Sequence, residues 1–320
     1  MFEFTHNNHY RYAYNDRRFV FKTNADDQLS VQIGKCAGLA QDWRFENARA
    51  ARLIHSKARP GQRIRLFYSG GIDSEIMVMA FQDAGVPFDC IIIDTGINDH
   101  DTEYAYKFCK EQDINYQVTK VDPISFVAQG KHYLYSDTYQ VKQLAMMIVM
   151  QAIDQLYNRN DIYLLGGEIF LNREPDLDRF YSSKDTQYSF KWYHAVREDN
   201  DLSYFKYALA TGTNLISEFF CYTPEQILSY LTDPLVDDLI NDRIDYKYSL
   251  MSTKPNVYAR YYQFEPRPKY HGYENAMYLN NKVYLDLGQP ADLGFGDIYY
   301  TEVNTLIRNL RHDQTADQGT

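Results

Sequence analysis

Residues 69–74 have the composition of a phosphate-binding loop. They read Ser-Gly-Gly-Ile-Asp-Ser and stand between a short apolar segment, 64–68, and a helical pattern that begins at Glu75. Two adjacent glycines allow a sharp turn that brings backbone N–H groups close to an anion. The helix that follows directs its positive end toward the same point. The pattern therefore predicts an anion site between a strand and a helix.

Three side chains of this loop have separate expected roles. The hydroxyls of Ser69 and Ser74 add hydrogen-bond donors for phosphate oxygens. The carboxylate of Asp73 repels phosphate, so we expect it to hold a divalent cation that bridges phosphate oxygens, and we assign it a catalytic and a metal-binding role. The loop lacks the lysine and the spacing of a Walker A loop, and it does not match the G-x-S-x-G nucleophile elbow.

The whole string resembles the PP-loop, SGGxDS, of the ATP pyrophosphatase superfamily. That superfamily includes asparagine, β-lactam, NAD and GMP synthetases, tRNA-modifying enzymes and PAPS reductases. The resemblance implies ATP and Mg²⁺ as cofactors and a five-stranded parallel sheet that binds ATP at the carboxyl ends of its strands. It implies that all six loop residues bind the nucleotide: Ser69, Gly70, Gly71, Ile72, Asp73 and Ser74.

Two further stretches resemble the same superfamily. Ile-Asp-Thr-Gly at 93–96 resembles the end of the second strand in the PAPS reductase and NAD synthetase branches, beside adenine and ribose. Leu-Leu-Gly-Gly-Glu at 164–168 resembles the asparagine synthetase turn that presents acidic residues to metal and substrate, although the family has a longer acidic string there. The resemblance implies nucleotide contacts from Ile93, Asp94, Thr95, Gly167 and Glu168, with Glu168 as a second metal ligand.

The superfamily that the loop resembles includes enzymes that adenylate a substrate with ATP. The resemblance therefore also implies a lysine that stabilises the leaving group of that reaction. The candidates lie in a Tyr-rich region, 249–273, or just before it, and they are Lys247, Lys254 and Lys269. We expect this region to form loops that act as a lid, and we assign catalytic roles to Lys254 and Lys269. For each lysine the alternative is a solvated loop cation. The residues from Glu218 to Glu225 indicate a helix boundary near the substrate pocket.

The elements around these residues alternate between strands and helices, which predicts an open parallel α/β sheet. The resemblance implies that this sheet is of the HUP type, like that of adenine nucleotide alpha-hydrolases. Strands are expected at 64–68, 88–94, 116–121 and 161–165, and helices at 75–82, 101–111 and 138–157. Outside this core we expect a β-hairpin from strands 10–14 and 19–22, helices at 45–57, 203–209, 224–231, 235–242 and 302–311, and a strand at 283–287.

Three regions follow from this organisation. Residues 1–62 are expected to form an N-terminal hairpin and helix extension, 63–172 the ATP-binding domain, and 173–320 a mainly helical substrate and lid region. The longest apolar run, 144–150, is far shorter than the roughly 20 residues of a membrane span. The N-terminus shows no basic segment followed by an apolar one, so we recognise no signal peptide and expect a cytoplasmic protein.

Charge and cysteine content narrow the function further. The 320 residues carry 33 Lys and Arg against 43 Asp and Glu, a net charge of −10, which argues against general nucleic-acid binding. The four cysteines, Cys36, Cys90, Cys109 and Cys221, form no CxxC pair, so neither a zinc cage nor a disulfide framework is expected. PAPS reductases use a cysteine in a C-terminal tail, and no cysteine follows Cys221 here.

The resemblance, taken with these absences, implies an AMP-forming ligase or amidotransferase-like enzyme that adenylates a small substrate and releases pyrophosphate. Asparagine synthetase has a nucleophilic cysteine after its initiator methionine, but this chain has Phe2, so nitrogen is expected from free ammonia, an amine or a separate donor protein. The alternatives are a PAPS reductase-like nucleotide-binding protein without reductase chemistry and a non-catalytic protein with a vestigial loop. The stand-alone organisation resembles phage-encoded PP-loop proteins, and a homodimer is compatible with the sequence.

Overall fold

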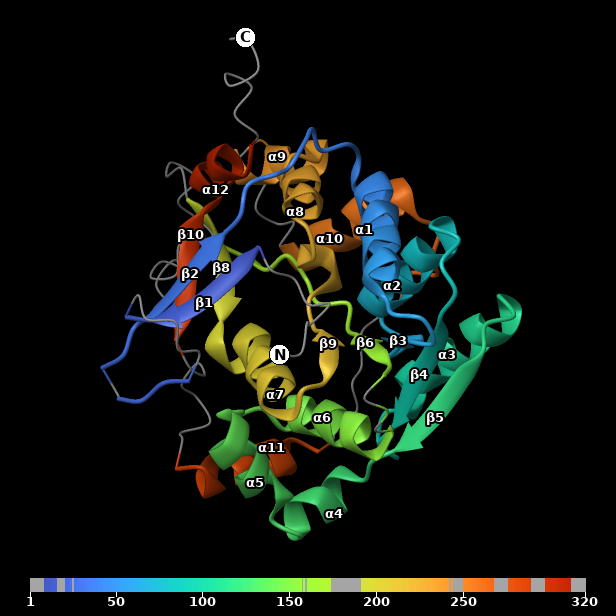
Figure 1. Ribbon diagram of the computed structural model, residues 1–320, viewed down its shortest axis with the longest axis vertical. Coiled ribbons are helices and arrows are strands. Elements are labelled where there is room, and N and C mark those ends of the chain that lie inside the picture. Colours follow the sequence, from blue (N-terminus) through green and yellow to red (C-terminus); the bar gives the residue numbers. More distant parts are fainter. Residues whose placement is uncertain are drawn as a thin grey trace.

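In the computed structural model, a five-stranded parallel sheet forms the centre of the chain (Figure 1). The strands lie in the order β5 (Tyr116–Lys120), β4 (Asp89–Asp94), β3 (Ile64–Phe67), β6 (Ile162–Leu164) and β9 (Asn214–Ile216). The structure describes residues 9–15, 21–24, 26–156, 158, 160–173, 191–241, 243, 250–267, 276–288 and 297–311. The expected α/β class with an open parallel sheet is confirmed.

Alternate residues of the central strands contribute to two separate hydrophobic cores. Leu66 and Ile92 belong to one core, while their neighbours Phe67 and Ile91 belong to the other, as the period of two in a strand requires. The first core includes buried residues of α1 (Trp43–Lys57), α2 (Ile72–Asp83) and α3 (Asp99–Glu111). The second includes α6 (Leu144–Leu156) and α7 (Ser203–Thr211). Helices therefore cover both faces of the sheet.

The direction in which strands are added to the sheet reverses at β3. The chain continues from β3 through α2 to β4 and through α3 to β5, and then returns to place β6 and β9 on the other side of β3. Such a reversal leaves a crevice at the carboxyl ends of the two strands that flank it, which is where α/β sheets bind ligands. The loop 69–74 follows β3 and the turn 166–168 follows β6, so both lie at this crevice.

Two small antiparallel sheets lie beside the central one, on the left of Figure 1. One pairs β1 (Tyr10–Tyr14) with β2 (Leu29–Ile33), and the other contains β7 (Leu171–Arg173), β8 (Trp192–Arg197) and β10 (Ile298–Glu302). The described C-terminal part is otherwise mainly helical, as expected. Its helices after α7 are α8 (Pro224–Leu231), α9 (Pro234–Ile240), α10 (Leu250–Tyr261), α11 (Met277–Asp286) and α12 (Val303–Leu310).

The N-terminal hairpin exists, but its second strand was assigned wrongly. Tyr10–Tyr14 pairs with Leu29–Ile33 and not with 19–22, of which 19 and 20 lie outside the described residues. The alternation Leu-Ser-Val-Gln-Ile fits a half-buried strand, and Leu29 and Val31 are its buried members. The longer connection contains a turn in which Asp27 accepts hydrogen bonds from the backbone N–H groups of residues 23 and 24.

Three other expected elements also differ. The helix expected at 138–157 is two helices, α5 (Lys131–Tyr139) and α6, because Gln140 adopts a left-handed conformation and its side chain bonds the backbone of Lys22. The strand expected at 283–287 is part of α11, whose Val283 is fully buried. The region 249–273, expected to form loops, contains α10 despite Pro255 in its interior.

Tertiary packing explains α10. The ring of Tyr258 stacks on that of Trp43 at 4.8 Å, and Val257 and Tyr258 are almost completely buried. Burial of this apolar surface offsets the hydrogen bond that proline removes from the helix. The proline and tyrosines of this segment favour a loop, but packing against Trp43 of α1, about 200 positions earlier, makes it a helix.

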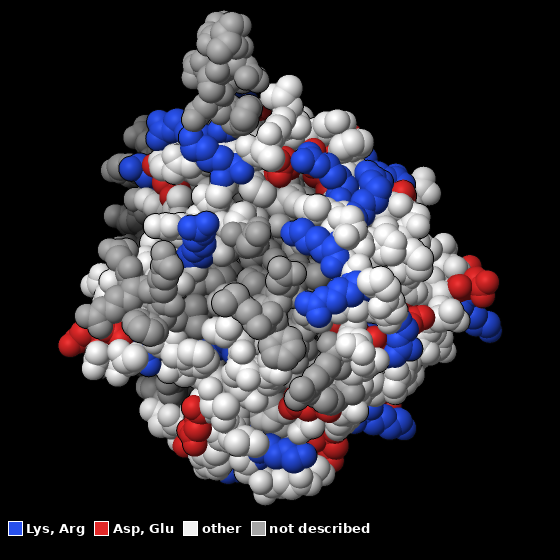
Figure 2. Space-filling view, viewed as in Figure 1, with Lys and Arg blue, Asp and Glu red and all other residues white. Residues whose placement is uncertain are grey.

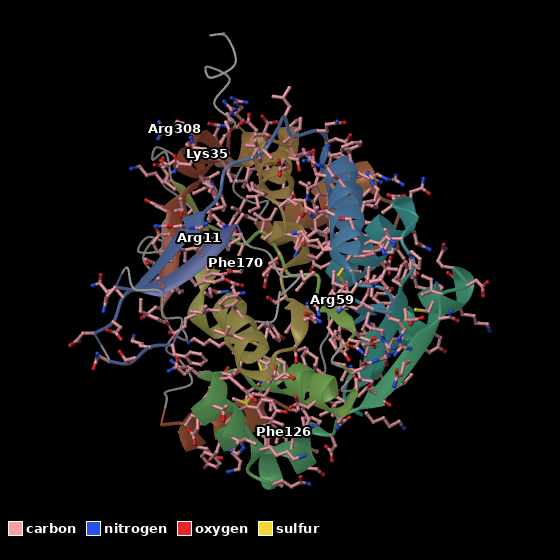
Figure 3. All side chains as sticks on the ribbon, viewed as in Figure 1. Arg11, Lys35, Arg59, Phe126, Phe170 and Arg308 are labelled. Carbon is pink, nitrogen blue, oxygen red and sulfur yellow. The ribbon has the colours of Figure 1, made fainter. Side chains whose placement is uncertain are left out.

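The outer surface is mixed in character. Figure 2 shows charged side chains of both signs scattered over one face among uncharged ones. Within the described part of the chain, no helix combines the length and apolar character that a membrane crossing requires. The helices α4 (Pro123–Ala128) and α5 lie at the lower end of the molecule, where Figure 3 labels Phe126.

Two histidines, the half-buried His9 and the buried His194, join the hairpin to the rest of the fold and predict acid sensitivity. The Nε2 atom of His9 lies 2.7 Å from the carbonyl of Cys221, and His194 contacts the Tyr10 hydroxyl at 2.8 Å and the carbonyl of Phe170, labelled in Figure 3, at 3.0 Å. Burial lowers the pKa of His9 and of His194 to about 4. An imidazole in the unfolded chain titrates near 6.5, so the unfolded state binds more protons between these values.

We therefore expect the free energy of unfolding to fall as the pH is lowered from about 6.5 to about 4. Each buried imidazole contributes a slope of about 1.4 kcal/mol per pH unit within that window. Urea unfolding at several pH values measures this slope. The variant His194→Gln should show a shallower slope than the parent chain, whereas His55→Gln, on the exposed side of α1, should keep the parent slope. Equal slopes for parent and His194→Gln would contradict the assignment.

Candidate active site

A pocket of 380 Å³ opens at the crevice predicted by the sheet topology. The PP-loop-like segment 69–74 and the turn 166–168 form its polar side, and the end of β4 and the helix α6 form its apolar side. The apolar side includes Ile93, Met146 and Val149. The pocket thus combines a surface suited to a flat base with one suited to charged groups.

The loop 69–74 is held in shape by its own serines. The Ser69 N–H donates to the Ser74 hydroxyl at 3.2 Å, the two hydroxyls lie 3.1 Å apart, and Ser74 donates to the carbonyl of Gly71 at 2.9 Å. Gly71 begins α2 and provides no side-chain cap. The first N–H groups of α2 therefore have no cap from that position, which suits anion binding.

Gly70 is required by both conformation and space. Its φ is +84°, in the region that favours glycine, and a Cβ atom there would lie 1.8 Å from the backbone oxygen of Asp101 at the start of α3. No side chain can occupy that position without moving the loop or the helix. The loop and α3 therefore meet by direct backbone contact.

The two predicted metal ligands, Asp73 and Glu168, and the predicted Lys254 come together at the N-terminus of α2. The Lys254 ammonium lies 2.7 Å from Asp73 Oδ1 and 2.6 Å from Glu168 Oε2. We call Asp73, Glu168 and Lys254 the acid–lysine cluster. The Tyr258 hydroxyl also donates to Asp73 Oδ1, at 2.7 Å. Lys254 reaches the cluster from α10, a helix, and not from the loop that the sequence indicated.

The charges of the cluster stabilise one another. Burial disfavours the charged form of Lys254, but the carboxylates of Asp73 and Glu168 outweigh that effect and raise the pKa of its ammonium. Lys254 is therefore a cation held between two anions. This arrangement holds one ammonium beside the loop where phosphate is expected, within a cluster whose formal charge is −1.

The cluster also fits a magnesium ion bound together with phosphates. Asp73 and Glu168 both reach the same ammonium, so one cation can contact both carboxylates. Within the part of the chain that the structure describes, no group of three or more His, Cys, Asp or Glu side chains is arranged to hold a metal. Mg²⁺ commonly uses one or two carboxylates and completes its shell with water and substrate phosphates, which matches this donor set.

Gly167 serves the pocket in a way that the sequence did not indicate. Its φ is +63°, and a Cβ atom there would lie 2.1 Å from Oε2 of Glu218. The same carboxylate accepts a hydrogen bond from the backbone N–H of Glu168 at 3.3 Å. Gly167 thus makes room for Glu218, which lines the pocket beside Glu168. The sequence placed Glu218 near the pocket but gave it no role.

Glu218 has an unusual environment for a carboxylate. Burial raises its pKa well above the ordinary range, and the nearby Asp201 and Glu168 carboxylates add to this effect. A protonated carboxyl can donate a hydrogen bond to a ligand, which an ionised one cannot. Glu218 therefore adds a third acidic group to the polar wall of the pocket.

The predicted residues after β4 divide into two groups. Ile93 and Thr95 line the pocket, and the buried Thr95 hydroxyl has no hydrogen-bond partner among the described residues. Asp94, which the resemblance assigned to the nucleotide, does not line the pocket: its carboxylate accepts a hydrogen bond from the N–H of Gly96 at 2.9 Å and approaches Lys120 at 3.8 Å. Ile72 does not line the pocket either, because its side chain packs against the first core.

Arg267 supports the loop from the C-terminal side and was not assigned from the sequence. Its Nε donates to the carbonyl of Gly70 at 2.7 Å, and its guanidinium pairs with Glu75 and lies 4.8 Å from the centre of the Tyr104 ring. Its side chain is 4% exposed. No local pattern marks an arginine that bonds a loop 197 positions earlier. Lys247 and Lys269 lie outside the described residues.

All four cysteines are free and buried, and none of them lines the pocket. Cys90 and Cys109 lie in the first hydrophobic core, in β4 and α3 respectively. Both thiols therefore pack as small core residues.

Comparisons with known proteins give little further information. No protein-family model matches the chain, and no curated protein matches it. Among solved structures, the NH3-dependent NAD synthetase from Campylobacter jejuni subsp. jejuni NCTC 11168, in complex with the nitrate ion, is similar with a TM-score of 0.31 and 14% identity. The match covers 80% of this chain and 100% of that chain. A TM-score this low indicates nothing about the function of the chain, and the function proposed below rests on the pocket residues.

Proposed function

We propose that this protein is a PP-loop enzyme that binds ATP with Mg²⁺ and adenylates a small substrate, releasing pyrophosphate and AMP as amidation or ligation is completed. The observation that carries the proposal is the acid–lysine cluster at the N-terminus of α2, directly beside the Ser-Gly-Gly-Ile-Asp-Ser loop. A vestigial loop has no need for its own Asp73 to meet both Glu168, from the turn after β6, and the half-buried Lys254, from α10.

The pocket supports a specific orientation of the nucleotide. The apolar wall of Ile93, Met146 and Val149 suits the base. The loop 69–74 and the start of α2 suit the phosphates. The volume of 380 Å³ lies within the range of small-molecule sites.

The chain's own groups account for the expected chemistry. A substrate oxygen attacks the α-phosphorus, the bond from that phosphorus to the bridging oxygen breaks, and pyrophosphate leaves with the negative charge. We propose that Lys254, 2.7 Å from Asp73 beside the loop, neutralises charge on the phosphates and that the loop N–H groups orient them. When bound, Mg²⁺ would add Lewis-acid stabilisation of the phosphate oxygens, with Asp73 and Glu168 as its protein ligands.

The nitrogen source and the partners remain predictions. We propose that amidation uses free ammonia, an amine or a separate donor protein. No thiol is placed in the pocket, which supports a mechanism without a cysteine nucleophile.

Product identification tests the proposed function. The purified protein is incubated with ATP labelled at the α-phosphate, Mg²⁺ and fractions of a small-metabolite pool, and nucleotides and adenylated species are identified by mass spectrometry. We expect AMP and pyrophosphate in a substrate-dependent reaction. An Asp73→Asn variant processed in parallel controls for contaminating ATPases. Release of ADP and orthophosphate as the primary products would refute the proposal.

A further inference from the structure

The ammonium of Lys254 occupies the space that a metal ion would need. It lies within 2.7 Å of both Asp73 and Glu168, and its side chain is 17% exposed. A magnesium ion binds carboxylate oxygens at about 2.0–2.1 Å, so an ion bridging these two carboxylates would overlap the ammonium. The two cations cannot share this position.

We propose that Lys254 is a built-in counter-ion that fills the metal site while nucleotide is absent, so that the metal enters only together with nucleotide. The inference rests on the proposed function, because it assumes that this pocket binds a metal–nucleotide complex. In the empty pocket, a metal ion would have to displace an ammonium that, among the described residues, ion-pairs with no other anion than these two carboxylates. The triphosphate supplies that anion, so Lys254 can leave the carboxylates for the phosphates as the metal takes its place.

The architecture of α10 suits such a displacement. Pro255 follows Lys254 and lacks the N–H that would bond the carbonyl of residue 251, so the first turn is joined to the helix by fewer hydrogen bonds. Further along the helix, Tyr258 is fixed by its stacking on Trp43 and its hydrogen bond to Asp73. Lys254 can therefore move while the remainder of α10 stays in place.

The Tyr258 ring offers the Lys254 ammonium a contact besides the two carboxylates. The ammonium lies 5.7 Å from the centre of that ring, within the range of a cation–π contact. A lysine leaving the carboxylates thus keeps one favourable contact. A permanent structural salt bridge would not need this second partner, and it would not compete with a metal.

Binding of Mn²⁺, followed by electron paramagnetic resonance without nucleotide, tests the inference. We expect the parent chain to bind Mn²⁺ at least tenfold more weakly than Lys254→Met, whose side chain keeps its length but loses its charge. The control is Lys107→Met, which removes an exposed ammonium 2.8 Å from Glu265 and should behave like the parent. Adding Asp73→Asn to Lys254→Met should abolish the gain. Equal Mn²⁺ affinity of the parent and Lys254→Met would overturn the inference.

The thermal midpoint of unfolding is a second measurement, which applies even if Lys254→Met is less stable than the parent. Removing the ammonium leaves two carboxylates facing each other, so Mn²⁺ should raise the thermal midpoint of Lys254→Met and leave that of the parent unchanged. Addition of α,β-methylene ATP, which cannot be cleaved at the α-phosphate, should restore Mn²⁺ binding to the parent. If the parent binds neither this analogue nor its Mn²⁺ complex, the proposed function fails. If the parent binds the complex while both chains respond equally to Mn²⁺ alone, only the inference fails.

Discussion

Replacement of Asp73 by Asn is expected to lower the rate of magnesium-dependent AMP formation by about 1,000-fold while the protein remains folded. Asp73 is the residue at which the loop, the Lys254 ammonium and the Tyr258 hydroxyl meet, and it is the proposed metal ligand from α2. Loss of a metal ligand removes several kcal/mol of transition-state stabilisation, and each 1.36 kcal/mol corresponds to tenfold in rate. Rates of pyrophosphate release and calorimetric titration with Mg²⁺ and α,β-methylene ATP measure the two effects.

The same helix offers a matched control. Asp83 lies at the other end of α2, where it pairs with Arg44 at 2.7 Å on the surface. Asp83→Asn removes an equal charge from the same element and should leave rate and affinity within about twofold of the parent, because surface ion pairs contribute little. Magnesium-dependent affinity that is unchanged in Asp73→Asn would remove Asp73 from the proposed site.

The loop and most of the central sheet could be predicted because their signals are local. The strand β3, the turn at residues 69–71 and α2 follow one another directly, and a short sequence pattern describes all three. The apolar run before Ile93 marks β4 in the same way. Strand β9 was missed because its three residues, 214–216, include only two apolar ones, whereas the equally short β6 lies in an apolar run of four residues, 162–165.

The contacts that complete the site could not be predicted, because they join distant segments. Glu218 bonds the N–H of Glu168 across 50 positions, and Arg267 bonds the carbonyl of Gly70 across 197. No spacing rule links such pairs. The helix α10 shows the opposite failure: its proline and tyrosines give a loop signal, but packing against Trp43 decides the structure.

Gly167 illustrates an intermediate case. Its position in a Gly-Gly-Glu turn identified it as part of the site, but the resemblance implied contact with the nucleotide. In the structure it accommodates the side chain of Glu218, since a Cβ atom would lie 2.1 Å from that carboxylate. The sequence indicated which residue mattered, and only the fold showed what it makes room for.

Gly70→Ala is expected to destabilise the protein by more than about 3 kcal/mol and to abolish nucleotide binding. The positive φ of +84° alone costs an alanine about 1–2 kcal/mol. In addition, the new methyl group would lie 1.8 Å from the oxygen and 2.7 Å from the carbon of the Asp101 carbonyl, which are backbone atoms that cannot rotate away. The loop must shift from α3, and its N–H groups then no longer converge on the phosphates.

A comparison with Gly85→Ala separates the two contributions. Gly85 has a similar φ of +66°, at the end of α2, but a Cβ atom there meets nothing within 4 Å. This variant should therefore show only the conformational loss of about 1–2 kcal/mol and bind α,β-methylene ATP with Mg²⁺ like the parent. Urea unfolding and calorimetry give both quantities for each variant. If the two alanines destabilise the protein equally, the close approach of the loop to α3 is not a constraint in solution, and the loop geometry on which the nucleotide site depends would have to be abandoned.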